Sequence, residues 1–231
     1  MRVYFLVEGR RTESKVYAAW LSHLVPELSR IAFVDDPHPL SYFLISAEGY
    51  PSIISEMLPA SIRDINLSGT YNYLVVSLDA DEESVEDRVN EINQFLEDNN
   101  LSLLEAALVV IIQNRCIESW FLGNRRIVTR NPLSASLRLY QEFYDIVSED
   151  PELMGKYQGF GTHAQFHLQY LREIFRERSI TYSKRRPGHV LDKSYLDRLI
   201  ERVADRPSDL PSLQIFFTFC ERIREEIGLG H

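Results

Sequence analysis

The chain has 231 residues, of which 45% are hydrophobic and 26% are charged, and its formal net charge at pH 7 is -9. This length and apolar fraction suffice for one large domain, or for a core domain with a smaller addition. The charge excludes a uniformly basic nucleic-acid-binding protein, and no apolar stretch approaches the ~20 residues that a membrane-spanning helix needs. The chain enters a strand pattern at once, with the charged Glu8 where a signal peptide would be apolar, so we expect a cytoplasmic protein without a membrane partner.

The charge is distributed unevenly along the chain. Residues 1–114 contain 7 Lys and Arg against 18 Asp and Glu, whereas residues 115–231 contain 18 against 16. The acidic half would attract a metal ion, and the carboxyl half carries arginines suited to phosphates; solvated helix faces of different sign explain the difference equally well. Cys116 and Cys220 are too few for a disulfide framework or a four-cysteine metal site, and we expect buried thiols.

Strands and helices alternate in the first half of the chain. Apolar runs of strand type end at turn residues, and the segments between them have helical spacing of apolar residues. Such alternation predicts parallel βαβ units, and therefore an α/β fold with a mostly parallel sheet flanked by helices. The expected strands are 2–7, 31–34, 42–45, 71–78 and 107–112, and the expected helices begin after Thr12, near Ser52 and after Ser84.

The pattern changes after Asn114. A short helix is expected at 117–122, and no further strand is indicated. Two segments rich in turn or basic residues, 150–162 and 179–189, are predicted loops. Longer helices are predicted near 134–148, 163–178, 193–204 and 211–227.

Two acidic clusters stand where predicted strands end. Glu8 and Glu13 follow the first strand, and Asp79 and Asp81, with further acids at 82 and 83, follow the strand 71–78. Open α/β sheets hold their ligands at the carboxyl ends of their strands, and carboxylates gathered there repel one another unless they share a cation. Oxygen ligands select Mg²⁺, Mn²⁺ or Ca²⁺ over zinc. If the strand continued to residue 81, the side chains of Asp79 and Asp81 would lie on the same face of the sheet.

Each acidic cluster also has a purely structural explanation. Glu13 is well placed as an acidic residue in the first turn of a helix, where the helix dipole favours it. The second cluster would then be a solvated turn between a strand and a helix.

Taken together, these motifs resemble a known domain. Val7-Glu8-Gly9-x-x-Thr12-Glu13 followed by Leu78-Asp79-Ala80-Asp81-Glu82 resembles the TOPRIM domain of topoisomerases, primases and OLD-type nucleases, most closely its RloB-like branch. Asn114-Arg115-Cys116-Ile117-Glu118-Ser119-Trp120 looks like the RloB-like pattern that ends in Glu-x-Trp. The resemblance covers residues 1–124 as a metal-binding core and leaves 125–231 as a helical C-terminal region.

The resemblance implies a role for each acid. It makes Glu8 a metal ligand or general base, Asp79 and Asp81 metal ligands, and Glu13 and Glu118 further ligands, the cofactor being Mg²⁺ or Mn²⁺. A solvent-facing position on the short helix is an equally acceptable assignment for Glu118. The implied activity is a metal-dependent nuclease acting on DNA or RNA, in a bacterial antiviral defence system.

Basic residues supply candidate contacts to nucleic acid. Arg10 and Arg11, after Glu8, are placed to hold a phosphate, although loop solubility explains them too. Lys184, Arg185 and Arg186, near Tyr182 and His189, form a basic and aromatic patch suited to a nucleic-acid backbone. TOPRIM nucleases commonly have a lysine near the metal, and Lys15, Lys156, Lys184 and Lys193 are the candidates.

Other functions stay open. A catalytically silent module that binds an ATPase subunit is one; since the chain has no GxxxxGK[ST] loop, any ATPase would be a partner. A small-molecule phosphotransferase or phosphatase is another. His163 and His167 lie four apart but lack the HExxH pattern of a zinc site, and His23, His38 and His231 show no metal-site spacing. The sequence leaves the oligomeric state undetermined.

Overall fold

The computed structural model describes residues 1–229 and divides the chain into two compact units. The first unit comprises Met1–Leu78, Val85–Ile112 and the described residues from Ile215 onward, and the second comprises Asp79–Ser84 and Gln113–Gln214. Because these units are compact in themselves, each is described separately. The predicted boundary at residue 124 stays a prediction.

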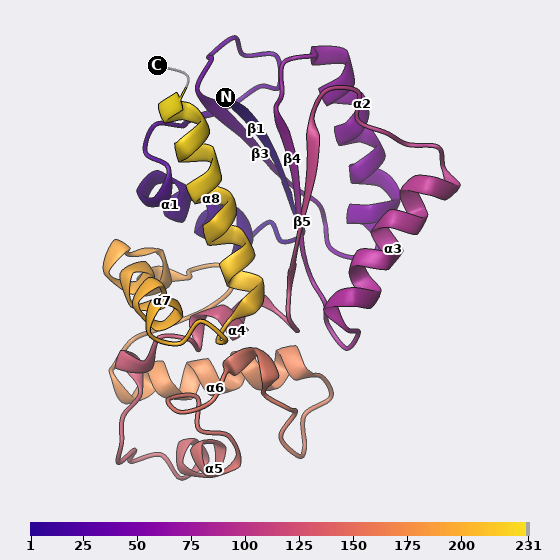
Figure 1. Cartoon of the computed structure of the whole chain (residues 1–231). Helices are drawn as coiled ribbons and strands as arrows, with labels where there is room; N and C mark the ends of the chain where they lie inside the picture. The colour runs from indigo at the N-terminus through magenta and orange to yellow at the C-terminus, as the bar shows by residue number, and fades with distance from the viewer. Residues whose placement is uncertain (230–231) are drawn as a thin grey trace. The chain divides into compact units, whose positions relative to one another are not determined.

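A five-stranded parallel sheet has the strand order β2-β3-β1-β4-β5 (Figure 1). The predicted α/β fold with a parallel sheet flanked by helices is therefore confirmed, and it is consistent with a TOPRIM-like fold. The strands are β1 (Arg2–Val7), β2 (Ser29–Ile31), β3 (Ser41–Ser46), β4 (Tyr73–Asp79) and β5 (Ala107–Gln113).

The central strand β1 is buried along its whole length because helices cover both faces of the sheet. Tyr4 faces one side, where its hydroxyl lies 3.3 Å from Ser61 Oγ of α2. Phe5 faces the other, with its ring centroid 6.0 Å from that of Tyr17 in α1 and 6.2 Å from that of Phe219 in α8. Figure 1 shows the same two layers, α2 and α3 on one face and α1 and α8 on the other. Continuous apolar strands are typical of a sheet covered in this way.

The helices of the first unit follow the predicted order. Helix α2 ends at Ser68 and is followed by Gly69, whose φ of 60° is the left-handed conformation that closes many helices. The bounds are α1 (Glu13–Leu24), the π-helix η1 (Ile53–Met57), α2 (Leu58–Ser68), α3 (Val85–Asp98) and α8 (Pro211–Leu229), whose first four residues belong to the second unit.

The second unit is helical, as predicted. Thr162 and Ser134 accept hydrogen bonds from backbone amides in the first turns of α6 and α5, which is the capping role that these residue types favour. The helices are α4 (Ile117–Phe121), α5 (Ala135–Phe143), α6 (His163–Glu177) and α7 (Lys193–Asp205), with 3₁₀ turns η2 (Arg125–Ile127), η3 (Pro151–Leu153) and η4 (Gly188–Leu191).

Several element ends differ from prediction, and two elements end clearly short of their predicted ends. The strand expected at 31–34 ends at Ile31, and the apolar Phe33 beyond it is 70% exposed. The helix expected to reach 148 ends at Phe143. Tyr144 is extended there, and its hydroxyl donates a hydrogen bond to the Asp150 carbonyl, which fixes the chain in a turn.

The expected buried thiols are confirmed. Cys116 in the second unit and Cys220 in the first are free and buried, and burial raises the pKa of both thiols. Across residues 1–229, no helix combines the length and apolar character needed to cross a membrane.

Candidate functional site

In the first unit, Glu8 lies at the carboxyl edge of the sheet. Its backbone N–H donates to the Ser77 carbonyl of β4 at 2.9 Å, so the pairing of β1 with β4 extends to this residue. The side chain is half-buried. The strand end thus places Glu8 where α/β proteins bind their ligands, as predicted.

Gly9 and Glu13 are in close contact. A Cβ added to Gly9 would lie 1.8 Å from Glu13 Oε2, so the Glu13 carboxylate occupies the space above this glycine. Glu13 is the first residue of α1, and it is only 7% exposed. Its side chain therefore turns back toward the loop that follows Glu8, and a larger residue at position 9 would require the Glu13 carboxylate to move.

Arg10 and Arg11 are exposed in the same loop. Arg10 Nη1 lies 4.0 Å from Glu48 Oε1, and the two side chains are 80% and 86% exposed. Such an exposed, long ion pair contributes little to stability.

In the second unit, Asp79 and Asp81 occupy different kinds of backbone. Asp79 is the last residue of β4 and is 7% exposed. Asp81 has a φ of 55°, and its N–H donates to the Arg115 carbonyl at 3.0 Å. The strand therefore ends before Asp81, and the alternation that would put both aspartates on one face does not apply.

Glu118 is fully buried on α4, so the structure contradicts the alternative of a solvent-facing residue. Its Oε1 accepts a hydrogen bond from the Tyr182 hydroxyl at 3.0 Å. Its Oε2 has no hydrogen-bond partner among the described residues, and Lys184 Nζ lies 3.9 Å from it. A buried carboxylate oxygen without a hydrogen-bond donor fits the role of a cation ligand.

Three charged groups shift the pKa of the Cys116 thiol. Burial raises the pKa of the Cys116 thiol, the negative charges of Glu118 and Asp79 raise it further, and the positive charge of Lys184 lowers it. The distance that the structure gives among these three groups is the 3.9 Å between Lys184 Nζ and Glu118 Oε2.

The basic loop is a tight turn. The Arg186 N–H donates to the Ser183 carbonyl at 2.9 Å, and Lys184, Arg185 and Arg186 are exposed. Tyr182 is 5% exposed, with its ring packed against Phe121, so it is not available for stacking on a base.

Among the four candidate lysines, Lys184 lies beside a predicted ligand, Glu118. Lys156 donates to the Gly161 carbonyl, and Lys193 pairs with Asp197. Lys15 is exposed in the first turn of α1.

The histidines at 163 and 167 do not converge on a common point. His163 lies 2.8 Å from Glu82 Oε2 through Nδ1, while Nδ1 of the buried His167 lies 2.9 Å from Ser119 Oγ. Glu82 also accepts a hydrogen bond from the His163 backbone N–H, so this acid caps α6. His231 lies outside the described residues.

Among residues 1–229, no three or more His, Cys, Asp or Glu side chains are grouped so that they could hold a metal ion. The oxygen-only chemistry of the predicted ligands still suits Mg²⁺ or Mn²⁺.

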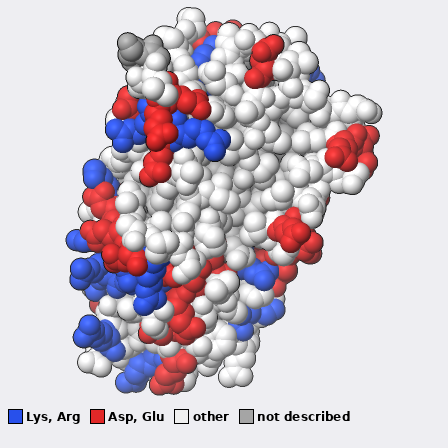
Figure 2. Space-filling model, viewed as in Figure 1, with Lys and Arg blue, Asp and Glu red and all other residues white. Residues whose placement is uncertain are grey.

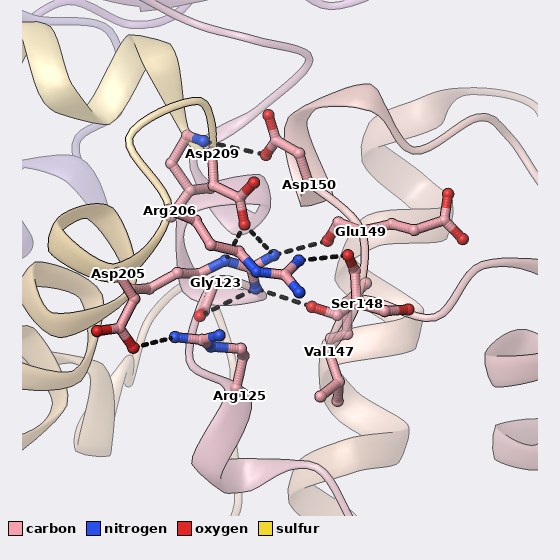
Figure 3. A network of polar contacts seen from close by, with 12 residues as sticks. Gly123, Arg125, Val147, Ser148, Glu149, Asp150, Asp205, Arg206 and Asp209 are labelled. Atoms are coloured by element: carbon pink, nitrogen blue, oxygen red, sulfur yellow. Dashed lines mark hydrogen bonds and ion pairs between the residues drawn. The ribbon is translucent and has the colours of Figure 1, made fainter.

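A polar network that sequence reasoning missed lies in the second unit (Figure 3). At its centre is Arg202 of α7, which is fully buried and hydrogen-bonded to Asp209 and to carbonyls of distant loops. No local signal marks it, since Arg198, the other arginine of α7, lies four positions earlier and is exposed.

Comparisons of the chain with protein-family models, with curated proteins and with solved structures found no match, so membership of the TOPRIM family stays a prediction.

Proposed function

We propose that the chain is a Mg²⁺- or Mn²⁺-dependent nuclease that hydrolyses phosphodiester bonds of DNA or RNA. The observation that carries this proposal is the position of two acids in the sheet. Glu8 follows β1 and Asp79 ends β4, and these two strands are parallel neighbours. The carboxyl edge of such a sheet is where α/β proteins place their ligands.

Glu8, Asp79 and Asp81 are the proposed principal ligands, and Glu13 and Glu118 are further ones. The metal would neutralise phosphate charge, activate water and stabilise the leaving oxygen. The fully buried Glu118 supports this assignment, because its Oε2 accepts no hydrogen bond among the described residues.

Arginines and a lysine supply the remaining positive charge. Arg10 and Arg11, exposed in the loop after Glu8, are proposed to hold the scissile phosphate by charge-assisted hydrogen bonds. Lys184, beside Glu118, balances negative charge near the ligands. Arg185 and Arg186 would bind the adjoining backbone.

The test is cleavage of plasmid and single-stranded DNA and of RNA with Mg²⁺ or Mn²⁺. Glu8→Gln and Asp79→Asn keep the side-chain shape but remove the charge that a cation needs, so each should lower the cleavage rate at least about a hundredfold. Thermal unfolding of both variants would establish that they fold.

Glu105→Gln is the matched control, because Glu105 is an exposed acid away from these motifs. It should cleave at the wild-type rate. Equal rates in the control and in the folded Glu8→Gln and Asp79→Asn variants would contradict the proposal.

A second candidate is a catalytically silent module that binds an ATPase subunit. Two observations favour it: Lys184 already supplies positive charge to Glu118, and no group of three potential metal-binding side chains occurs in the described part of the chain. For this candidate, wild-type protein would show no cleavage with either metal but would bind its ATPase partner tightly.

A further inference from the structure

The second unit contains a cleft of about 1000 Å³ that no sequence motif indicated. Its lining comes from the segment 125–132, from α5 and the turn after it, and from α7. We call it the arginine cleft after five of its lining residues, Arg125, Arg126, Arg130, Arg138 and Arg198.

Two of these arginines are already neutralised by acids of α7. Arg125 Nη2 lies 2.8 Å from Asp205 Oδ2, and Arg198 Nη1 lies 2.6 Å from Glu201 Oε2. Both acids also line the cleft. Because each pair combines one positive and one negative charge, the two pairs add nothing to the net charge of the cleft lining.

The other two acids of the lining differ in their contacts. Asp145 accepts hydrogen bonds from the Val147 N–H at 3.0 Å and from the Ser148 hydroxyl at 2.7 Å, so its carboxylate is held by its own turn. Glu142 is exposed on α5. Hydrogen bonds from neutral donors leave the Asp145 carboxylate charged, so both acids oppose the remaining arginines.

Arg126, Arg130 and Arg138 are exposed, and within residues 1–229 their guanidinium groups make no hydrogen bond or ion pair. Three arginines without a side-chain partner among the described residues thus share one cleft, whose lining of five arginines and four acids has a net charge of +1. The second unit as a whole, residues 79–84 and 113–214, contains 16 Lys and Arg against 17 Asp and Glu, so the excess of positive charge is local to the cleft. Figure 2 shows basic and acidic side chains interspersed over the helical part of the face in view.

One wall of the cleft is held in place by the network in Figure 3. Arg125 points toward Asp205 there, and Val147 lies on the neighbouring turn, which Arg202 ties down through the carbonyls of Ile146 and Glu149. A buried, fully hydrogen-bonded arginine makes such a wall rigid. The cleft is consequently formed before a ligand arrives, which lowers the cost of binding.

The chemistry of the lining selects the ligand. Guanidinium groups bind phosphates through paired hydrogen bonds, and several arginines along a cleft suit successive phosphates. The lining contains no aromatic residue, so it offers no platform on which a base could stack. Recognition would therefore depend on the backbone and not on base sequence.

We propose that the arginine cleft binds the phosphate backbone of a single nucleic-acid strand through Arg126, Arg130 and Arg138. The choice of nucleic acid among polyanions rests on the proposed function. This contact would hold the substrate on the second unit, independently of any metal.

Fluorescence anisotropy of a labelled single-stranded DNA in EDTA measures this binding without cleavage. The double variant Arg130→Gln/Arg138→Gln should weaken affinity about tenfold, and the slope of log K against log salt should fall by about 1.4, because each lost phosphate contact on a single strand removes about 0.7. A shuffled base sequence should bind wild-type protein equally well.

Arg30→Gln/Arg63→Gln is the matched control, because it removes the same charge from exposed positions of the first unit. It should leave affinity within about twofold of wild type. Equal weakening by the two double variants, no strand binding in EDTA, or binding of inorganic polyphosphate alone would overturn the proposal.

The two proposals fail in different ways. If strand binding depends on Arg130 and Arg138 but no metal supports cleavage, the nuclease proposal fails and the arginine-cleft proposal stands. If metal-dependent cleavage occurs but strand affinity does not change when these two arginines are replaced, the nuclease proposal stands and the arginine-cleft proposal fails.

Discussion

Arg202 shows how a fully buried charge is accommodated in the second unit. Its Nε and Nη2 both lie 2.8 Å from Asp209 Oδ2, and Nη1 donates to the Gly123 and Ile146 carbonyls at 3.2 and 2.8 Å. Nη2 also donates to the Glu149 carbonyl at 2.6 Å. One guanidinium group thus joins four segments, and removing it would leave a buried carboxylate and three carbonyls without their partner.

We expect Arg202→Met to lower the free energy of unfolding by about 3–5 kcal/mol, the usual cost of breaking a buried ion pair on one side. Arg198→Met on the same helix removes an exposed arginine and should cost much less, because a solvent-exposed ion pair contributes little to stability. Urea unfolding of both variants gives the comparison. Equal losses would show that the network adds nothing beyond ordinary surface charge.

His167 is held as a neutral side chain. Its Nε2 lies 3.2 Å from the Met154 carbonyl and its Nδ1 lies 2.9 Å from Ser119 Oγ. Burial lowers the pKa of His167 to about 4. The unfolded chain would take up a proton near pH 6.5, whereas the folded protein would do so only near pH 4, so stability is complete above pH 6.5 and is lost as the pH falls through this window.

We therefore expect His167→Gln to reduce the loss of unfolding free energy between pH 6.5 and pH 4 by about 3 kcal/mol, which is the equivalent of the pKa difference. Denaturant unfolding at several pH values measures it. His23→Gln, at an exposed histidine of α1, is the control and should keep the wild-type dependence. An unchanged profile in His167→Gln would contradict the neutral assignment.

The start of α8 depends on a buried acid from another segment. Glu152 accepts hydrogen bonds from the Ser212 N–H at 3.1 Å, the Ser212 hydroxyl at 2.7 Å and the Leu213 N–H at 3.4 Å. These are amides that a helix leaves without partners at its first turn. Burial nevertheless outweighs these bonds and raises the pKa of Glu152 to about 7.

For Glu152 the pH dependence has the opposite sign to that of His167. Between pH 4.5 and pH 7 the folded protein keeps a proton that the unfolded chain has lost, so stability falls as the pH rises through this window. We expect wild type to lose up to about 3 kcal/mol relative to Glu152→Gln between pH 4.5 and pH 8. Unfolding curves of the two proteins at both pH values test this, and a constant difference between them would refute it.

The elements themselves were largely predictable, because apolar spacing depends on neighbours in the chain. Their ends were less so. Local sequence places Phe33 in a strand, but it lies beyond the end of β2 and is exposed. The turn that gives Asp81 its positive φ depends on a hydrogen bond to Arg115, 34 positions away. Contacts of that kind leave no trace in local sequence.

Across the whole chain, sequence reasoning identified acids at strand ends but could not find what long-range packing creates. Glu8 and Asp79 were marked by the strands before them. Lys184 beside Glu118 joins residues 66 positions apart, and the arginine cleft is built from segments without a shared motif. Likewise, nothing local indicates that the described residues from Ile215 onward belong with the sheet.

The two cysteines are divided between the units, and each is sealed from solvent. An alkylating reagent reaches a thiol only after the structure around it opens. The alkylation rate of Cys220 therefore measures how often the unit that contains the sheet opens, and the alkylation rate of Cys116 measures the same for the helical unit. Each unit thus has its own native thiol probe, and no label needs to be engineered.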